Sequence, residues 1–160
     1  MPKQKGSIAL PLDKAEIIKD YRLAYQSRQA SLIGRREVLS GKAKFGIFGD
    51  GKELANLAIA HAFQKGDWRS GYYRDQTWMF MLNVMSIQEF FAQLYAHADL
   101  EHEPSTGGRS MNAHFGSRFI NSDGSWRNQM DMYNVVGDIS PTDAKMPRAV
   151  GLAYASVVYR

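Results

Sequence analysis

The first quarter of the chain places apolar residues with the period of an α-helix. Apolar side chains recur at helical spacing after Asp13, and Gly41 ends the pattern. Asp13 and Glu16 also have the spacing of a capping box. The positions that define the period are Ile17, Ile18, Tyr21, Ala24, Tyr25, Leu32 and Ile33. We therefore predict a helix over about 13–40, after an N-terminal arm of residues 1–12 that prolines and a glycine interrupt.

A second helical pattern follows a glycine-rich connection. The triplet Gly49-Asp50-Gly51 could hold a metal ion that bridges to a diphosphate, but helix-period apolar residues begin directly after it at Leu54. We therefore interpret the triplet as the turn that leads into a second helix. This helix is predicted to end near Lys65 and Gly66, where a cation in the last turn precedes a glycine.

Two shorter helical segments are predicted next. Residues 76–83 are mostly apolar and indicate one or two buried turns, and Ser86 with Glu89 repeats the capping-box spacing before an aromatic-rich run. We expect His61 and His97, which lie in helical patterns, to be structural, and no histidine pair has the spacing of a zinc site. The methionines expected in the core are Met79, Met81 and Met85.

The pattern changes after the fourth segment. Residues 100–129 are rich in glycine, proline and polar residues and predict a long loop, which is often functional. His114 lies in this loop and is a better site candidate than the helical histidines. Residues 135–139 predict a buried strand, and Pro147 suits the first turn of a last helix. The apolar stripe of that helix is Val150, Tyr154, Val157 and Val158.

The end of the chain suggests a longer protein. The last helical pattern reaches Arg160 without a terminating residue, and one strand is too little sheet for an α/β core. We therefore expect residues 13–160 to be the N-terminal part of a domain that is truncated at its C-terminus.

Composition narrows the choice of function. The 160 residues suit one domain, with 44% hydrophobic and 22% charged residues. The net charge of +4 is spread along the chain, which argues against nucleic-acid binding. The chain has no cysteine, so disulfides, thiolate metal sites and a cysteine nucleophile are excluded, and a cytoplasmic location is consistent with this. It also lacks a signal-peptide pattern and an apolar run of about 18 residues, so we expect no membrane span.

The segment Gly71-Tyr72-Tyr73-Arg74-Asp75 concentrates candidate chemistry. The planar guanidinium of Arg74 can bind a phosphate or carboxylate in bidentate fashion, and a neighbouring tyrosine can add a hydroxyl donor. Taken by themselves, the same residues are more often a structural loop, with the arginine paired to Asp75 and the tyrosines half-buried. Taken alone, so short a motif does not decide between these interpretations.

Three segments together resemble a known family. Tyr72-Tyr73-Arg74-Asp75, then Gly108-Arg109-Ser110-Met111 with His114, then 140–151 from Ser140-Pro141-Thr142 onward, are similar to the α subunit of thiamin-diphosphate-dependent 2-oxo acid dehydrogenases. The resemblance covers roughly residues 13–160, and the version at 109–116 is closest to the branched-chain type. It implies an α/β thiamin-diphosphate-binding fold, of which this incomplete part is mainly helical with at least one buried parallel strand.

The resemblance also implies roles for single residues. Tyr73 and Arg74 would contact thiamin diphosphate, with Arg74 on the diphosphate, and Ser140 and Thr142 would line its aminopyrimidine side. Thr142 departs from the bulky aliphatic residue that is usual there. Tyr72, Arg109 and His114 would belong to the substrate and active-site loop region, His114 as a catalytic candidate whose role stays open.

Two further implications concern metals. Where the branched-chain enzymes hold a potassium ion, this chain has Ala144 and Lys145, so we hypothesise that the Lys145 ammonium replaces that ion. The magnesium-binding motif of the family would lie beyond residue 160, and no metal ligand is expected in this segment.

The activity implied is oxidative decarboxylation of a small 2-oxo acid, such as 3-methyl-2-oxobutanoate, with acyl transfer to a lipoyl domain. The partners implied are a β subunit (or the β half of a fused chain) in a heterotetramer and a lipoyl-bearing acyltransferase. The fragment alone would be inactive. Alternatives are a pyruvate dehydrogenase α subunit, a non-catalytic helical interaction domain, and a phosphate-binding module that uses Arg74 and Arg109.

Overall fold

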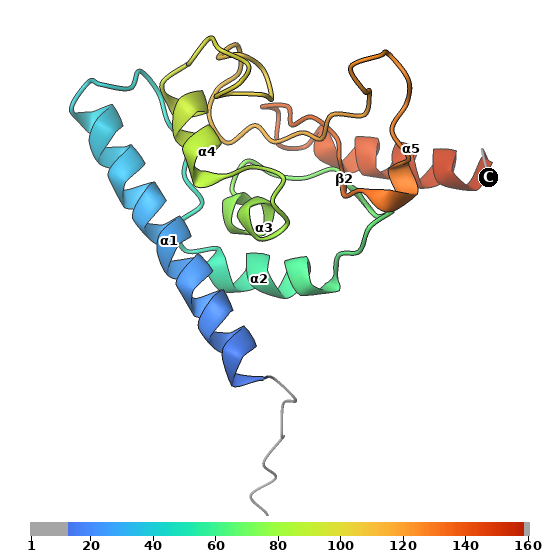
Figure 1. Cartoon of the computed structure of the whole chain (residues 1–160), viewed down its shortest axis with the longest axis horizontal. Helices are drawn as coiled ribbons and strands as arrows, with labels where there is room; N and C mark the ends of the chain where they lie inside the picture. Colours follow the sequence, from blue (N-terminus) through green and yellow to red (C-terminus); the bar gives the residue numbers. More distant parts are fainter. Residues whose placement is uncertain (1–12, 159–160) are drawn as a thin grey trace, which may run out of the picture.

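A computed structural model describes residues 13–158 of the chain. It is mainly helical, with one small parallel sheet (Figure 1), as predicted for part of an α/β fold. The predicted arm, residues 1–12, lies outside the described residues. No helix among the described residues is long and apolar enough to cross a membrane. The elements are α1 (Lys14–Leu39), α2 (Glu53–Ala62), β1 (Trp68–Arg69), α3 (Gln76–Met81), α4 (Ile87–Leu94), the 3-10 helix η1 (Gln129–Asp131), β2 (Asn134–Val135) and α5 (Lys145–Val158).

Helix α3 occupies the middle of the molecule. It packs against α1 and α2, and all of its residues from Gln76 to Phe80 are buried. The core around it contains Met79, Met85 and Phe90, which are almost fully buried, so two of the three methionines predicted for the core lie in its centre. The capping box predicted at Ser86 and Glu89 is present at the start of α4.

Helix α1 has the predicted length, but the face that it buries is not the apolar one that the sequence predicts. Its apolar positions, such as Ile17 and Tyr21, are exposed, and its buried residues are small: Ser27, Ala30, Ser31 and Gly34. The reason is the side chain of Gln76, which donates to the carbonyl oxygen of Ser27 at 2.9 Å and therefore needs a close approach of α3 to α1. The predicted capping box at this helix is wrong, because the Asp13 side chain makes no capping hydrogen bond.

The glycine triplet forms a turn that leads into α2, as predicted. Helix α2 ends at Ala62, earlier than predicted, and Gly66 forms a later turn with a φ of 92°. His61 bonds Asp20 across 2.6 Å and so joins α2 to α1, which confirms the structural role predicted for this histidine.

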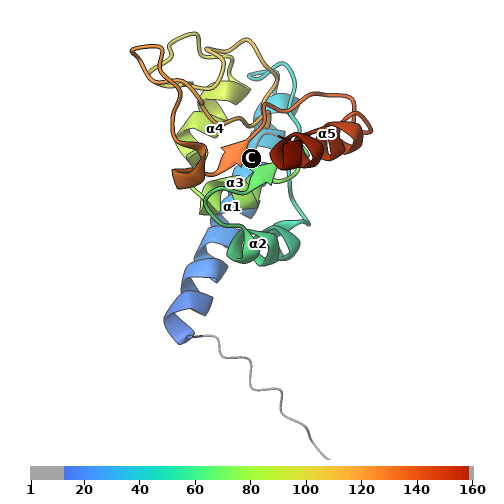
Figure 2. The same cartoon turned by 90° about the vertical axis from the view of Figure 1, so that its right-hand side faces the viewer.

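The sheet was only partly predicted. Strand β2 covers Asn134–Val135 instead of 135–139, and it pairs in parallel with β1, which the sequence did not reveal. In both views the sheet lies above α2 and beside α5 (Figure 2). The apolar stripe predicted for α5 is exposed, with Val150 at 69% and Tyr154 at 71%.

Candidate functional site

The candidate site is built around a buried arginine at the end of β1. Arg69 is only 2% exposed. Its Nη2 donates to a carboxylate oxygen of Asp75 at 2.7 Å and to one of Asp138 at 3.3 Å. Asp75 follows the tyrosine pair, whereas Asp138 follows β2, so one guanidinium joins two segments that are distant in sequence.

The tyrosine segment is a tight turn closed by Asp75. The carboxylate of Asp75 accepts the backbone N–H of Tyr72 at 2.8 Å, and the backbone N–H of Asp75 donates to the Tyr72 carbonyl oxygen at 3.0 Å. This arrangement places Tyr73 and Arg74 between the two closed ends of the turn. The motif is therefore positioned by its own carboxylate, and Asp75 is committed to Arg69 rather than to Arg74.

The two phenols of this turn interact directly. The Tyr72 hydroxyl donates to the Tyr73 hydroxyl at 2.8 Å. That hydrogen bond lowers the pKa of the Tyr73 phenol, and the nearby Thr142 hydroxyl lowers it further, while the pKa of Tyr72 is raised. Tyr73 is thus the more acidic of the pair, and it lies beside one of the predicted cofactor-binding residues.

Lys145 brings a positive charge to the same place. It is 5% exposed, and its ammonium lies 4.4 Å from the ring centroid of Tyr72 and 4.6 Å from that of Tyr73. Burial lowers the pKa of Lys145, an effect that the carboxylate of Asp138 opposes. The Nζ atom is buried and makes no hydrogen bond to any described residue. Its stabilisation therefore comes from the two ring faces and from charges at longer range.

His114 meets Ser140 next to this group. Its Nδ1 lies 3.2 Å from the carbonyl oxygen of Asn112, and its Nε2 lies 3.2 Å from the hydroxyl of Ser140. A carbonyl oxygen only accepts, so in the neutral ring Nδ1 carries the hydrogen and Nε2 accepts from Ser140. The side-chain amide of Gln93 in α4 holds the backbone of His114. Its N–H donates to the carbonyl oxygen of His114 at 3.0 Å, and its oxygen accepts the N–H of His114 at 3.3 Å.

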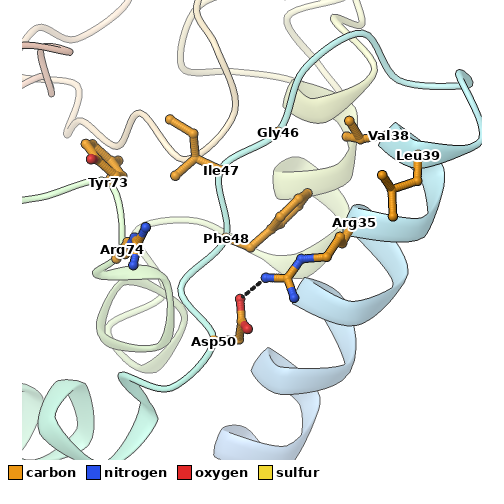
Figure 3. Close-up of a pocket in the computed structure, with 9 residues that line it drawn as sticks. All are labelled: Arg35, Val38, Leu39, Gly46, Ile47, Phe48, Asp50, Tyr73 and Arg74. Carbon is orange, nitrogen blue, oxygen red and sulfur yellow. Dashed lines mark hydrogen bonds and ion pairs between the residues drawn. The ribbon is translucent and has the colours of Figure 1, made fainter.

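Arg74 lines a concave pocket of about 390 Å³ together with Tyr73 (Figure 3). The end of α1 and the segment 46–50 form the other walls, where Arg35 donates to Asp50 at 2.7 Å. The guanidinium of Arg74 makes no hydrogen bond or ion pair to the part of the chain that the structure describes. The pocket therefore contains two guanidinium groups. That of Arg35 is paired with a carboxylate, and that of Arg74 has no such partner among the described residues. Its remaining lining residues are Val38, Leu39, Gly46, Ile47 and Phe48.

Arg109 makes no hydrogen bond to the tyrosine pair, His114 or Lys145 among the described residues. Its Nη1 donates to the carbonyl oxygen of Thr106 at 3.2 Å, and its surroundings are set by Glu103, a buried carboxylate. Glu103 accepts hydrogen bonds from the backbone of Ser105, Thr106 and Gly108 and from the Thr106 hydroxyl.

The structure thus brings the predicted residues together in three contacts. Tyr72 and Tyr73 lie with Thr142 and Lys145, His114 lies with Ser140, and Arg74 shares a pocket with Tyr73. Sequence reasoning missed Arg69, Asp138 and Arg35. In the structure Gly71 lies against Arg69, since a Cβ there would lie 1.9 Å from the Cζ atom of Arg69, but the sequence alone carries no signal for this close approach.

No group of three or more acidic or histidine side chains that could hold a metal ion occurs within residues 13–158. The carboxylates at the site are each paired with an arginine, Asp50 with Arg35 and both Asp75 and Asp138 with Arg69, which leaves cations, hydroxyls and a histidine for a ligand. Such a set suits an anionic organic ligand rather than a divalent cation.

Comparison with known protein families is consistent with a site for an anionic organic ligand. A family model described as the dehydrogenase E1 component matches residues 21–146, which is most of the chain. The chain belongs to this family. Its members are thiamin-diphosphate-dependent E1 components of 2-oxo acid dehydrogenases and generally act with a β subunit and a lipoyl-bearing acyltransferase. The resemblance found in the three motifs is therefore confirmed at the level of the family.

Proposed function

We propose that this chain contributes part of the thiamin diphosphate site of a branched-chain 2-oxo acid dehydrogenase, as the N-terminal part of a larger domain formed by residues 13–160 and further sequence. The observation that carries the proposal is the available Arg74 guanidinium at the wall of a pocket shared with Tyr73. Arg74 would bind the diphosphate, and Tyr73, Ser140 and Thr142 would line the remainder of the cofactor.

The donors fit a thiamin cofactor in charge and in kind. A guanidinium matches the diphosphate, and hydroxyls can hydrogen-bond an aminopyrimidine ring. When bound, the cofactor supplies the carbanion chemistry of decarboxylation. The chain's own residues would bind and orient the cofactor, and the His114 imidazole, which contacts Ser140, would be a candidate to hold a proton there. Tyr72 and Arg109 would border the substrate.

The assembled enzyme would decarboxylate a 2-oxo acid, with 3-methyl-2-oxobutanoate preferred and pyruvate second, and pass the acyl group to a lipoyl acceptor. We propose an αβ heterotetramer in the cytoplasm and a magnesium ion held by residues outside these 160. Exposed apolar faces on α1 and α5 support a subunit that assembles with others. The same faces would also suit a non-catalytic interaction domain, so cofactor binding is the deciding property.

The test is a thiamin diphosphate titration of the full-length protein with magnesium, for the wild type and for Arg74→Met. We expect magnesium-dependent binding that weakens by roughly tenfold to a hundredfold in the variant, because a charge-assisted bidentate contact contributes about 1.5–3 kcal/mol. Arg118→Met is the matched control, since the Arg118 side chain is exposed and makes no polar contact to a described residue. Absence of binding to the wild-type protein would remove the proposal.

Substrate preference is tested by carbon dioxide release from 3-methyl-2-oxobutanoate and from pyruvate under the same conditions. A higher kcat/KM for pyruvate would reassign the chain to the pyruvate type. If the enzyme released carbon dioxide over many turnovers without a lipoyl acceptor, this would argue against the acyl-transfer step.

We also propose that Lys145 takes the place of a potassium ion. Its buried ammonium supports this, because a fixed internal cation makes an added monovalent ion unnecessary. The unfolding midpoint should then be the same in potassium and sodium buffers of equal ionic strength. A specific rise in potassium would contradict the idea, and Lys145→Gln should create the potassium dependence that the wild type lacks.

A further inference from the structure

We propose that Arg69 is a positioning residue of the candidate cofactor site, which sets the Tyr72–Asp75 turn and the His114 loop relative to each other. The inference rests on the proposed function, since it concerns the same site. Arg69 is the buried residue of strand β1, and it does not line the pocket that Arg74 lines. Its role would therefore be exerted through other residues.

The first link runs from Arg69 to the turn. Its Nε and Nη2 both donate to the same oxygen of Asp75, at 3.1 and 2.7 Å, and Nη2 also donates to the Tyr72 carbonyl oxygen at 2.9 Å. That Asp75 oxygen also accepts the Tyr72 N–H. Both ends of the turn that presents Tyr73 and Arg74 are thus fixed to one guanidinium.

The second link runs from Arg69 to the histidine loop. Nη1 lies 3.4 and 3.3 Å from the two carboxylate oxygens of Asp138, whose side chain is fully buried. The same carboxylate accepts the N–H of Phe115 at 3.2 Å, and the Asp138 N–H donates to the Phe115 carbonyl oxygen at 3.0 Å. Phe115 is the neighbour of His114, so the position of the imidazole depends on Asp138 and, through it, on Arg69.

The guanidinium has little freedom to move. It lies over the ring of Trp78 at 5.5 Å and over that of Phe115 at 5.6 Å. The backbone of Gly71 closes a further side, because a Cβ there would lie 1.9 Å from the Arg69 Cζ atom. Lysine cannot reproduce this arrangement, since its single ammonium lacks the planar fork that reaches both carboxylates at once.

Charge balance makes the pair of carboxylates dependent on Arg69. Asp75 and Asp138 are the acidic partners, and Arg69 is the only cation that hydrogen-bonds either of them within residues 13–158. Lys145 adds a second positive charge at longer range, where it interacts with both carboxylates without a hydrogen bond. Removal of Arg69 alone would leave the buried carboxylate of Asp138 and the partly buried one of Asp75 without the cation that lies between them, which is strongly unfavourable.

The experiment separates positioning from stability. Thiamin diphosphate affinity and urea stability are measured on the full-length protein for the wild type, Arg69→Met, and the double variant Arg69→Met with Asp138→Asn. The double variant removes one of the two uncompensated charges and should regain much of the lost stability. It still lacks the fork that joins the turn to the loop, so its cofactor affinity should stay about tenfold to a hundredfold below that of the wild type, as for residues that orient metal ligands.

The matched control is Arg28→Met. Arg28 also makes a two-pronged contact with a carboxylate, donating to Glu53 at 2.6 and 2.8 Å, but it joins α1 to α2. It should lose stability while its cofactor affinity changes by less than about twofold, as expected for a site with no shared partners. Arg69→Lys should bind cofactor weakly even if it is stable.

Recovery of both stability and affinity in the double variant would overturn the inference, because Arg69 would then be merely structural. A second readout holds even if the wild type does not bind the cofactor, in which case the proposed function fails by itself. Hydrogen exchange at the backbone amides of Tyr72 and Phe115 should rise together in Arg69→Met, or in the double variant if the single one does not fold. Unchanged protection at Phe115 would refute the coupling of the two segments.

Discussion

At the scale of single residues, Glu103 shows how a charge can organise a loop. Its carboxylate is fully buried and accepts four hydrogen bonds from the segment 105–108. A carboxylate offers only acceptors, which suits a site where every neighbour is a donor. This internal anion explains how a stretch rich in glycine and polar residues holds one conformation beside Arg109.

Glu103→Gln should destabilise the protein by about 1–3 kcal/mol, because the amide brings an N–H group toward the backbone N–H of Ser105 and removes the charge. The measurement is urea unfolding at neutral pH. Glu101→Gln is the control, since Glu101 is exposed and should change stability by less than about 0.5 kcal/mol. Equal effects of the two substitutions would contradict the role assigned to Glu103.

The same residue predicts a pH dependence. Burial, the largest single influence, raises the pKa of the Glu103 carboxyl, but the hydrogen bonds from Thr106, Gly108 and Ser105 together hold this pKa below its ordinary value. Its contribution to stability is therefore fully present above the unfolded pKa of about 4.3 and is lost as the pH falls through the folded pKa. The stability difference between the wild type and Glu103→Gln should shrink as the pH is lowered through this range. A difference that stays constant down to acidic pH would show that Glu103 is not the titrating group.

At the scale of elements, the two predicted capping boxes had opposite outcomes. The Ser86 hydroxyl accepts the N–H of Glu89 at 3.1 Å, and the Glu89 carboxylate accepts the N–H of Ser86 at 2.6 Å. Asp13 precedes α1 with extended backbone but makes no capping hydrogen bond. Spacing alone therefore identifies where a helix begins, and only side-chain conformation decides whether the cap contributes.

This contrast gives a matched pair of substitutions. Ser86→Ala should lower the free energy of unfolding by about 1 kcal/mol, because the backbone N–H of Glu89 in the first turn of α4 loses the hydroxyl that accepts it. Asp13→Ala should cost less than about 0.5 kcal/mol, since it removes no cap. Urea unfolding of both variants is the measurement. A larger loss at Asp13 would mean that its side chain caps α1 in solution.

The helices were predictable from the periodicity of the sequence, whereas β2 was predicted with other bounds and β1 was not predicted. Strands β1 and β2 are two residues long, which is too short to show alternation, and their pairing joins Trp68 to Asn134 across the chain. The buried face of α1 was misjudged for a related reason, because the polar side chain of Gln76 selects small residues as its partners. The tyrosine turn and His114 were found from residue type, but Arg69 needs a tertiary contact to be recognised.

At the scale of the whole molecule, the described chain leaves two apolar helix faces uncovered. On α1 these include Tyr21 at 72% exposure, and on α5 they include Tyr154 at 71%. Large exposed apolar patches are unusual on monomers and mark surfaces that pack against another protein or further chain. The first turn of α5 lies at the candidate site through Lys145, so whatever covers this helix also lies near the cofactor-binding residues.

The proposed αβ assembly therefore predicts a specific effect of charge on α5. Tyr154→Glu should leave the stability of the described core within about 0.5 kcal/mol, because the side chain is exposed there. It should lower the mass of the assembled full-length enzyme in analytical ultracentrifugation, because a buried unpaired carboxylate would oppose association. Ser156→Glu is the control, since it adds the same charge to another side of the same exposed helix turn. An unchanged mass for Tyr154→Glu would mean that this face of α5 lies outside the subunit contacts, and the assembly would then have to be sought on the apolar face of α1.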